Sequence, residues 1–360
     1  MVEWLNYRHG RQVFLGYPLR FLRICWISTV LWFVFEIYNL YLGNWYYVGV
    51  PADRLMRWGG TFVSFSTVLP GLWVTQRFLY DSLPDSLSHR PSLSLPEFID
   101  PLVITAGLVG SVGPLIQPEL LYPLVWGGLL FVADGIAYRC NWRSFRGQWE
   151  SGDLKPVVSW LLSGAICGLL WEFWNVQATA GWIYTVPGMG EWRLFEMPLL
   201  GYLGFPPFAL MVRRLHTVYE DGPWNRSWIS GVGMFLFSGL LILLTLVAMD
   251  RYTFVSYKIE PMKFIGWTQQ ERQIYQQQEK SIGKRWENYF PLKSSKRKIK
   301  LLRFASMGTR SANCLWKNGV RSVQMIENKT SSQLVDIMVG CRAGYRPFWQ
   351  RRVTDWKQRF

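Results

Sequence analysis

Long apolar segments recur along the first 250 residues and are separated by short polar loops that contain arginine. Runs of about 20 apolar residues are typical of helices that cross a lipid bilayer. We predict seven such spans, at 21–42, 59–79, 99–116, 120–138, 156–176, 195–215 and 229–249. The third is short and rich in glycine, so it fits either a span or a re-entrant segment. The pattern predicts an all-α fold, in which a polytopic membrane helix bundle (1–250) precedes a smaller domain.

The pattern of apolar and polar positions changes after residue 250. The glutamine-rich stretch TQQERQIYQQQEK lies in 251–292 and predicts a polar helical linker. Residues 293–360 combine the basic run KSSKRKIK with apolar residues at helical spacing, which predicts a small basic helical domain. The closing segment RPFWQRRVTDWKQRF is basic and aromatic, and it fits either an interfacial helix or a docked tail.

One motif occurs twice in the membrane part. The segments FEIYNLYLGNWYYVGVP (35–51) and WEFWNVQATAGWIYTVP (171–187) share the order E-x-x-N, W-x-Y and V-P. The offset in the chain from Glu36 to Glu172 is the same as the offset from Asn39 to Asn175. Three further pairs share this offset: Pro51 and Pro187, Arg57 and Arg193, and Pro70 and Pro206. We therefore predict an internally duplicated two-helix unit, with repeats at about 31–75 and 167–211.

The duplicated motif supplies the candidate functional residues. A spacing of i, i+3 places the glutamate and the asparagine of each copy on one helical face. A pseudo-symmetric intramembrane cavity of carboxylates, carboxamides and aromatic rings is therefore predicted. Candidate acid/base residues are Glu36, Glu172 and Glu196; candidate ligand-binding residues are Asn39, Asn175, Trp45, Tyr47, Trp182, Tyr184, Arg57 and Arg193. An intramembrane ionisable residue is a functional-site hypothesis by default. The alternative is structural: each glutamate pairs with Arg57 or Arg193 and holds the helices together.

Charge and composition indicate how the protein is oriented in the membrane and argue against metal-binding and cofactor-binding sites. The chain has a formal net charge of +15, and the whole excess lies after residue 250. Arginines in the short loops favour a cytoplasmic N-terminus, and they leave the side of the C-terminal domain open. The three histidines and five cysteines are scattered, and no phosphate-binding or dinucleotide-binding motif occurs. We therefore expect no disulfide framework, no metal and no cofactor.

Four phrases carry a resemblance to a known group of proteins: WFVFEIYNLYLGNWYYVGVP, FSTVLPGLW, GLLWEFWN and WIYTVPGMGEWRLFEMPLLGYLGFPPFAL. They resemble a family of uncharacterised multi-spanning prokaryotic membrane proteins. This resemblance implies an integral, multi-pass protein of an inner or thylakoid-type membrane. Met211 follows PFAL at a position where the family pattern leads us to expect a glutamate.

A fainter similarity links the motif to the small membrane lycopene cyclases, which carry a W-x-Y stretch ahead of a helix with proline and glutamate. In this chain Glu196 precedes Pro198, whereas the cyclase motif has proline before a glutamate pair. Cyclisation of that kind needs a protonated acid and aromatic faces that stabilise a carbocation. The similarity implies an isoprenoid-like or lipid ligand.

The segment FASMGTRSANCLWKNGVRSVQMIENKTSSQLVDIMVGCRAG resembles a helix-hairpin-helix unit. The resemblance implies that Gly308 lies in a tight hairpin whose backbone N–H groups bind phosphate, although Ser306 replaces the usual first glycine. Candidate anion-binding residues are Gly308, Lys296, Arg297 and Lys298. Candidate partners of this domain are an anionic lipid surface or a protein. Nucleic acid is a less favoured partner, because it requires a cytoplasmic domain.

Two function classes remain open, and the sequence does not decide whether the protein is an enzyme. In the first, the membrane part binds or acts on an isoprenoid-like or lipid ligand. In the second, it is a non-catalytic membrane scaffold whose basic C-terminal domain recruits anionic lipid, protein or nucleic acid.

Overall fold

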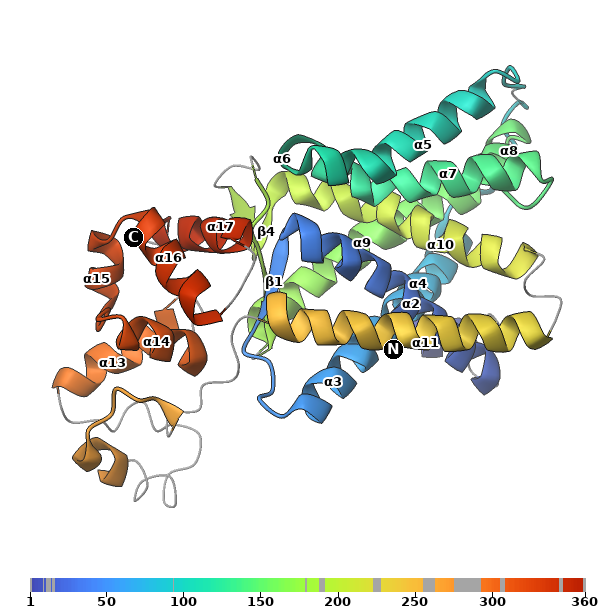
Figure 1. Ribbon diagram of the computed structural model, residues 1–360. Helices are drawn as coiled ribbons and strands as arrows, with labels where there is room; N and C mark the ends of the chain where they lie inside the picture. Colours follow the sequence, from blue (N-terminus) through green and yellow to red (C-terminus); the bar gives the residue numbers. More distant parts are fainter. Residues whose placement is uncertain are drawn as a thin grey trace. The chain divides into compact units, whose positions relative to one another are not determined.

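The computed structural model describes residues 2–8, 10, 14, 17–92, 94–178, 180–187, 192–222, 228–254, 263–274, 293–304, 308–342 and 346–358. The chain divides into two compact units. The membrane unit comprises Met1–Leu42, Trp58–Val176 and Pro187–Leu246, and the C-terminal unit comprises Gly43–Arg57, Gln177–Val186 and Val247–Phe360. Helices make up most of both units (Figure 1), as the sequence predicts, with short strand pairs in addition.

Five helical stretches among the described residues are long and apolar enough to cross a membrane. They are α2 (Pro18–Leu42), α5 (Ile99–Ile116), the stretch Pro118–Arg139, α9 (Lys155–Gln177) and Ser230–Tyr252 of α11 (Trp228–Tyr252). The third of these, Pro118–Arg139, consists of α6 (Pro118–Leu121), η2 (Tyr122–Leu124) and α7 (Val125–Arg139). These helices indicate a multi-pass membrane protein.

The other two predicted spans are interrupted. The segment 59–79 contains α3 (Arg54–Ser66) and α4 (Val68–Ser82), which are separated at Thr67. The segment 195–215 contains η3 (Leu199–Gly204) and the start of α10 (Phe205–Asp221), after the two-residue strands β3 (Arg193–Leu194) and β4 (Met197–Pro198). Pro206 and Pro207 occupy the first turn of α10, where a missing N–H removes no helical hydrogen bond. The total of seven spans therefore stays a prediction.

The helices and strands around the motif also repeat along the chain, and their first residues are separated by about the same offset as the two copies of the motif. Strand β2 (Gly181–Tyr184) follows β1 (Trp45–Val48) at the same offset that separates Glu172 from Glu36. Helix α9 follows α2, and the start of α10 follows the start of α4, with nearly this offset. The order of helix, strand and interrupted helix is thus common to both copies of the motif.

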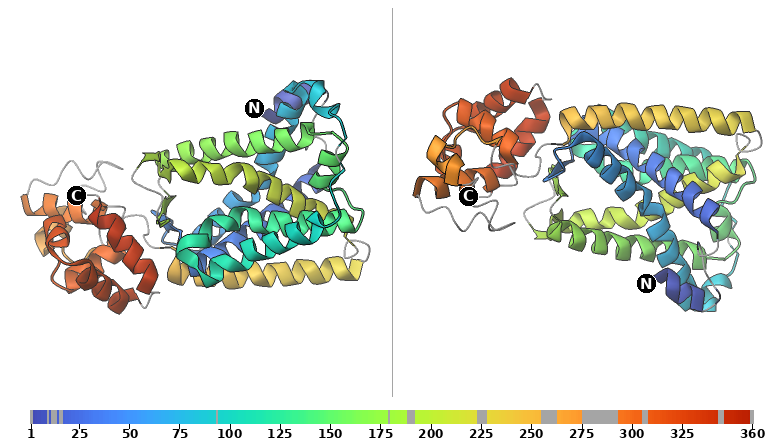
Figure 2. Two further views of the ribbon diagram at one scale, coloured as in Figure 1. Left: turned by 90° about the horizontal axis from the view of Figure 1, so that it is seen from above. Right: turned by 90° about the horizontal axis from the view of Figure 1, so that it is seen from below.

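Glycines allow close helix packing in the membrane unit. Helices α5 and α7 lie side by side (Figures 1 and 2), and a Cβ on Gly128 would lie 2.5 Å from the carbonyl carbon of Gly110. Helix α9 packs on α10 in the same way, because a Cβ on Gly164 would lie 2.4 Å from the carbonyl oxygen of Phe205. Small residues are the usual means by which membrane helices approach closely. Shorter elements complete this unit: α1 (Val2–Arg8), η1 (Asp85–Ser88) and α8 (Phe145–Glu150).

The C-terminal unit has its own hydrophobic core. Its helices are α13 (Lys293–Arg303), α14 (Gly308–Lys317), α15 (Val323–Asn328), α16 (Ser331–Arg342) and α17 (Arg346–Lys357). Phe264 and Trp267 belong to this core, although the sequence places them in a polar linker. The rest of the predicted linker lies partly outside the described residues. The predicted boundary near residue 250 stays a prediction, and 263–274 packs with the C-terminal helices.

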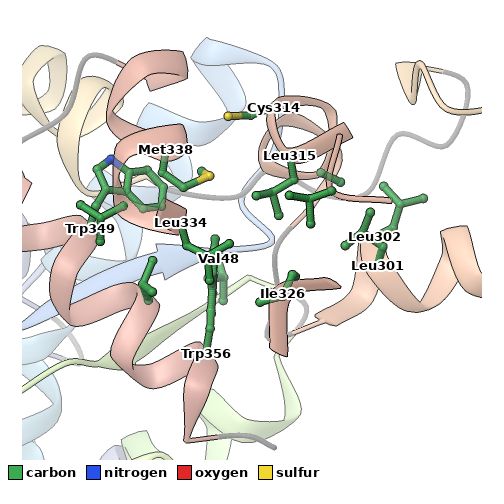
Figure 3. Packing of buried hydrophobic residues seen from close by; sticks show 14 of the residues in the cluster. Val48, Leu301, Leu302, Cys314, Leu315, Ile326, Leu334, Met338, Trp349 and Trp356 are labelled. Carbon is green, nitrogen blue, oxygen red and sulfur yellow. The ribbon is translucent and has the colours of Figure 1, made fainter. Parts of the chain in front are cut away.

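The core of the C-terminal unit also includes residues from the duplicated motif. Strands β1 and β2 pair antiparallel, with Tyr46 opposite Ile183. Tyr46, Val48 and Ile183 are buried in the same cluster as the C-terminal helices, and Figure 3 shows Val48 among Leu334 and its neighbours. The membrane part of the sequence thus contributes two strands to the C-terminal unit.

Helix α17 is a docked tail and not an interfacial helix. Trp349, Val353 and Trp356, at positions i, i+4 and i+7, are almost completely buried in the core. A disulfide between Cys314 and Cys341 joins α14 to α16. The expectation that the scattered cysteines form no disulfide is wrong for this pair, because the fold brings together two cysteines that are 27 residues apart in the chain.

Candidate functional site

The two motif glutamates lie inside the membrane unit. Glu36 on α2 and Glu172 on α9 both have an exposed fraction of 0%, and Asn39 and Asn175 are buried one helical turn later. Ile37 on α2 is exposed, which is what a lipid-facing side of the same helix requires. Each glutamate therefore shares a buried helical face with its asparagine.

One aromatic cluster connects the two copies of the motif. The rings of Phe35 and Trp171, which directly precede Glu36 and Glu172, lie 5.4 Å and 6.5 Å from the ring of Phe208 on α10. Trp32 and Trp126 contact the same ring, with centroid distances of 5.6 Å and 5.8 Å. We call these five aromatic residues the Phe208 cluster. The structure therefore brings the two glutamate-bearing helices to a common set of aromatic side chains.

The Phe208 cluster also makes a polar contact with one glutamate. The indole Nε1 of Trp32 donates a hydrogen bond to Oε1 of Glu36, at 3.2 Å. Met211 lies one turn after Phe208 on α10 and is completely buried. The position where the family resemblance leads us to expect a glutamate thus also faces the interior of the bundle.

Arg57 forms an ion pair with Asp250, whereas the structural interpretation of the motif predicts that Arg57 pairs with a motif glutamate. Its Nε lies 2.7 Å from Oδ1 of Asp250, and its Nη1 donates to the carbonyl oxygens of Pro51 and Ala52. These residues all belong to the C-terminal unit, and Arg57 is almost fully buried there. Sequence reasoning missed Asp250 because 193 residues separate it from Arg57.

The remaining candidates of the second copy lie near the surface of the membrane unit. Arg193 is exposed on the short strand β3. Glu196 is partly exposed in the turn that connects β3 to β4. The two copies are therefore most alike at the glutamate and asparagine positions and least alike at the arginines.

The four W-x-Y aromatic residues alternate along the strand pair with Tyr46 and Ile183. They pair across the ladder, Trp45 with Tyr184 and Tyr47 with Trp182. The Trp182 indole N–H donates to the hydroxyl of Tyr184 at 2.8 Å. The structure therefore brings these four residues together in the C-terminal unit, whereas the glutamates and asparagines belong to the membrane unit.

The predicted anion-binding residues divide into exposed and buried positions. Lys296 and Arg297 are exposed on α13, together with Lys300. Gly308 opens α14 with a left-handed φ of 69°, a conformation that favours glycine. Ser306 lies outside the described residues. Lys298 is buried, and its Nζ lies 2.6 Å from Oε2 of Glu271, so its charge is already neutralised.

Glu271 is the centre of this buried network. It accepts hydrogen bonds from Ser295, at 2.6 Å, and from the backbone N–H of Thr268, at 2.8 Å. Burial raises the pKa of Glu271, but the bonds from Lys298, Ser295 and Thr268 outweigh that effect, and the pKa lies below its usual value. Lys298 therefore stabilises the C-terminal unit, and an anion-binding surface would consist of the exposed basic residues of α13.

A second group of buried charges lies in the membrane unit and has no signal in the sequence. Arg214 and Asp134 form an ion pair at 2.7 Å, and Asp134 also accepts the backbone N–H groups of Phe145 and Arg146. These contacts fix the start of α8 against α7 and α10. Long-range pairs of this kind cannot be read from local spacing.

Among the described residues, no group of three or more histidine, cysteine, aspartate or glutamate side chains could hold a metal ion. Comparison of the chain with protein-family models, with curated proteins and with solved structures gives no match.

Proposed function

We propose that the membrane unit binds an apolar ligand of isoprenoid or lipid type between the two copies of the motif. The proposal rests on two features of these helices. Glu36 and Glu172 are completely buried, and their neighbours Phe35 and Trp171 both contact Phe208. A carboxyl group inside a membrane-spanning helix is uncommon, and it marks a candidate functional site. A protonated acid can anchor a polar group of the ligand or donate a proton, and aromatic faces can stabilise a developing positive charge.

The recurrence of element bounds supports the internal duplication on which this proposal rests. The two strands of the motif repeat with the offset of the two glutamates, and they pair antiparallel with each other. This pairing is what a local two-fold axis between the copies would produce. Two acids related in this way would approach one ligand from opposite sides.

The rings of the Phe208 cluster pack against one another, so a ligand has to displace at least one of them. Phe208 is the common contact, and its replacement by alanine removes the ring that both Phe35 and Trp171 contact. The proposal therefore expects Phe208→Ala to increase the amount of bound ligand, at a cost in stability of about 3–5 kcal/mol.

The test is mass spectrometry of the lipids and pigments that co-purify with the wild type and with the Glu36→Gln and Glu172→Gln variants. Glu119→Gln is the matched control, because Glu119 is exposed in the first turn of α6. We expect a defined apolar molecule in the wild type and the control, and its loss from folded Glu36→Gln and Glu172→Gln proteins. The same bulk phospholipids in all four samples would contradict the proposal.

A second candidate function is a membrane scaffold that holds the basic C-terminal unit. It is favoured by the burial of Tyr46, Val48 and Ile183 in the C-terminal core and by the Arg57–Asp250 pair. In this function the exposed basic residues of α13 would contact anionic lipid or a protein partner. Glu172→Gln would then lower the melting temperature without releasing a specific ligand, and this outcome separates the two functions.

We infer that the N-terminus is cytoplasmic and that the C-terminal unit lies on the opposite side of the membrane. The arginines of the short loops support the first part. For the second part, helices α2, α9 and α11 each continue in the chain into a segment of the C-terminal unit. The Cys314–Cys341 disulfide also suits an oxidising compartment.

Labelling with a membrane-impermeant maleimide tests this orientation. A cysteine introduced as Lys300→Cys should react in intact cells, whereas the exposed native Cys140, after α7, should react only in permeabilised cells. The reverse pattern would place the C-terminal unit in the cytoplasm.

A further inference from the structure

Two arginines that play no part in the proposed function pack against the same tryptophan in the membrane unit. The Cζ atoms of Arg20 on α2 and Arg213 on α10 lie 5.5 Å and 4.6 Å from the centre of the Trp73 ring on α4. Cation–π contacts of this kind hold a guanidinium in place without neutralising its charge. Three helices thus position two like charges around one indole.

Arg213 makes a hydrogen bond to a neutral partner. Its Nη1 lies 3.2 Å from Nδ1 of His216, and a guanidinium can only donate, so Nδ1 accepts and the imidazole proton is on Nε2. His216 is 1% exposed, and its ring packs edge-on against Trp73. The Trp160 ring also lies near the guanidinium, at 5.9 Å. Aromatic rings and a neutral imidazole thus contact Arg213 directly, and the carboxylates of Glu220 and Asp221 act on it without an ion pair to it.

The acidic residues of this region have other partners. Asp221 pairs with Arg143 at 2.7 Å, and Asp134 pairs with Arg214. Glu220 lies 3.5 Å from both Arg143 and His216. Within the described part of the chain, no carboxylate lies at ion-pair distance from Arg20 or Arg213. Two cations held in place without a carboxylate favour an external anion.

An open apolar groove lies along the same turns of α2 and α4. Its volume is about 540 Å³, and it is lined by Phe14, Pro18, Phe21, Pro70, Gly71 and Val74, with Thr67 and Glu3. Oε1 of Glu3 accepts the backbone N–H of Phe14, at 2.6 Å. Arg20 lies in the same first turn of α2 as Pro18 and Phe21. Trp73, which contacts both arginines, lies within one turn of Pro70 and Val74 on α4.

We propose that Arg20, Arg213 and this groove form a binding site for an anionic phospholipid. The two guanidiniums bind the phosphate through charge-assisted hydrogen bonds, and an acyl chain occupies the groove. A free phosphate would satisfy the arginines but leave the apolar groove exposed, so the combination of charge and groove favours the lipid. The site lies on the basic-loop side of the membrane unit and is independent of the two motif glutamates.

Native mass spectrometry of the full-length protein in detergent tests the site with phosphatidylglycerol, phosphatidylcholine and inorganic phosphate as separate probes. We expect the wild type to retain phosphatidylglycerol in preference to phosphatidylcholine. The Arg20→Gln/Arg213→Gln double variant should bind phosphatidylglycerol about thirtyfold more weakly, because each lost charge weakens binding about fivefold. Arg139→Gln is the control, because Arg139 is exposed at the end of α7 and should leave binding unchanged.

A second variant tests the groove without touching a charge. A Cβ on Gly71 has no atom within 4 Å, so Gly71→Leu extends into the groove without a clash in the bundle. It should weaken phosphatidylglycerol binding and leave the binding of inorganic phosphate unaltered. Unchanged phosphatidylglycerol binding in either the double arginine variant or Gly71→Leu would overturn the proposal, as would equal retention of phosphatidylcholine by the wild type.

Discussion

Glu271 lies almost completely buried in the C-terminal unit, where Lys298, Ser295 and the backbone N–H of Thr268 all donate to its carboxylate. Removal of one member of such a group leaves a buried charge without compensation, which commonly costs about 3–5 kcal/mol. The network joins the short helical turn after Trp267 to α13. Loss of these hydrogen bonds should therefore weaken the packing of residues 263–274 on the C-terminal helices.

The protonation of Glu271 gives a pH prediction. Its pKa is lower in the folded chain than in the unfolded chain, so its contribution to stability is complete above the unfolded value of about 4.3. That contribution is lost as the pH falls through the folded pKa. Pulse proteolysis of the C-terminal unit in urea, with an acid-tolerant protease, should show a midpoint that starts to drop below about pH 5. Glu271→Gln should lower the midpoint at neutral pH and flatten the profile, whereas Glu327→Gln, at an exposed position, should change neither.

At the residue scale, the sequence identified charged positions better than their partners. Glu36 and Glu172 stand out in the sequence because a membrane helix seldom contains a carboxylate, and both are buried. The pairing of Arg57 with Asp250 could not be inferred, because local spacing says nothing about residues so far apart in the chain. Lys298 looked like its exposed neighbours in a basic run, and only the packing of α13 shows that it faces Glu271.

At the scale of elements, the contact between α9 and α10 depends on a missing side chain. A Cβ on Gly164 would lie 2.4 Å from the carbonyl oxygen of Phe205 and 2.8 Å from the Cβ of Ala209. Backbone atoms cannot move aside as a flexible side chain can. In the first copy of the motif, the residue at the same offset is Ser28, which bonds to the backbone of Phe65 and Leu69 at the break between α3 and α4.

Gly164→Ala should therefore separate α9 from α10. We expect a loss of about 1–3 kcal/mol and a lower thermal midpoint, because the inserted methyl group overpacks the interface. Gly233→Ala on α11 is the control, since a Cβ there has no atom within 4 Å and the residue is exposed. Thermal unfolding of both variants in the same detergent measures the difference. Equal midpoints would show that the interface can relax.

Apolar runs were sufficient to locate the uninterrupted helices α2, α9 and α11, because each combines length with a continuous apolar sequence. They did not reveal the break at Thr67, since the hydropathy on both sides of it is similar and the stabilising hydroxyl of Ser28 comes from another helix. The pairing of β1 with β2 was also beyond local reasoning. Each strand has only four residues and follows soon after a long helix.

At the scale of the whole molecule, the disulfide belongs to one unit alone. Cys314 and Cys341 are 27 residues apart and join α14 to α16. We expect Cys314→Ala/Cys341→Ala to destabilise the C-terminal unit by about 3–4 kcal/mol through the entropy of its unfolded chain. Pulse proteolysis should show this loss in the C-terminal unit, with no change in the thermal unfolding of the membrane unit.

Cys140→Ala serves as the control for that experiment, because Cys140 is free and exposed. Dithiothreitol should lower the midpoint of the wild type to that of the double variant and leave the double variant itself unchanged. A wild-type midpoint that is insensitive to dithiothreitol would contradict a stabilising disulfide.

The division of the chain into units was predicted only in outline. The change in charge near residue 250 identified two parts with different properties. It could not show that 43–57 and 177–186 belong with the second part, because their aromatic composition is equally typical of a membrane interface.

The C-terminal unit is built from three stretches that lie far apart in the chain, and this has a consequence for biosynthesis. Arg352 of α17 donates to the hydroxyl of Tyr46, and 306 residues separate the two. Strands β1 and β2 are therefore made long before the helices that cover Tyr46 and Ile183. A ribosome that stops early releases a chain whose apolar strand faces stay uncovered, and exposed surfaces of this kind are recognised by chaperones and proteases. Completion of the C-terminal core thus requires that synthesis has proceeded at least as far as α17.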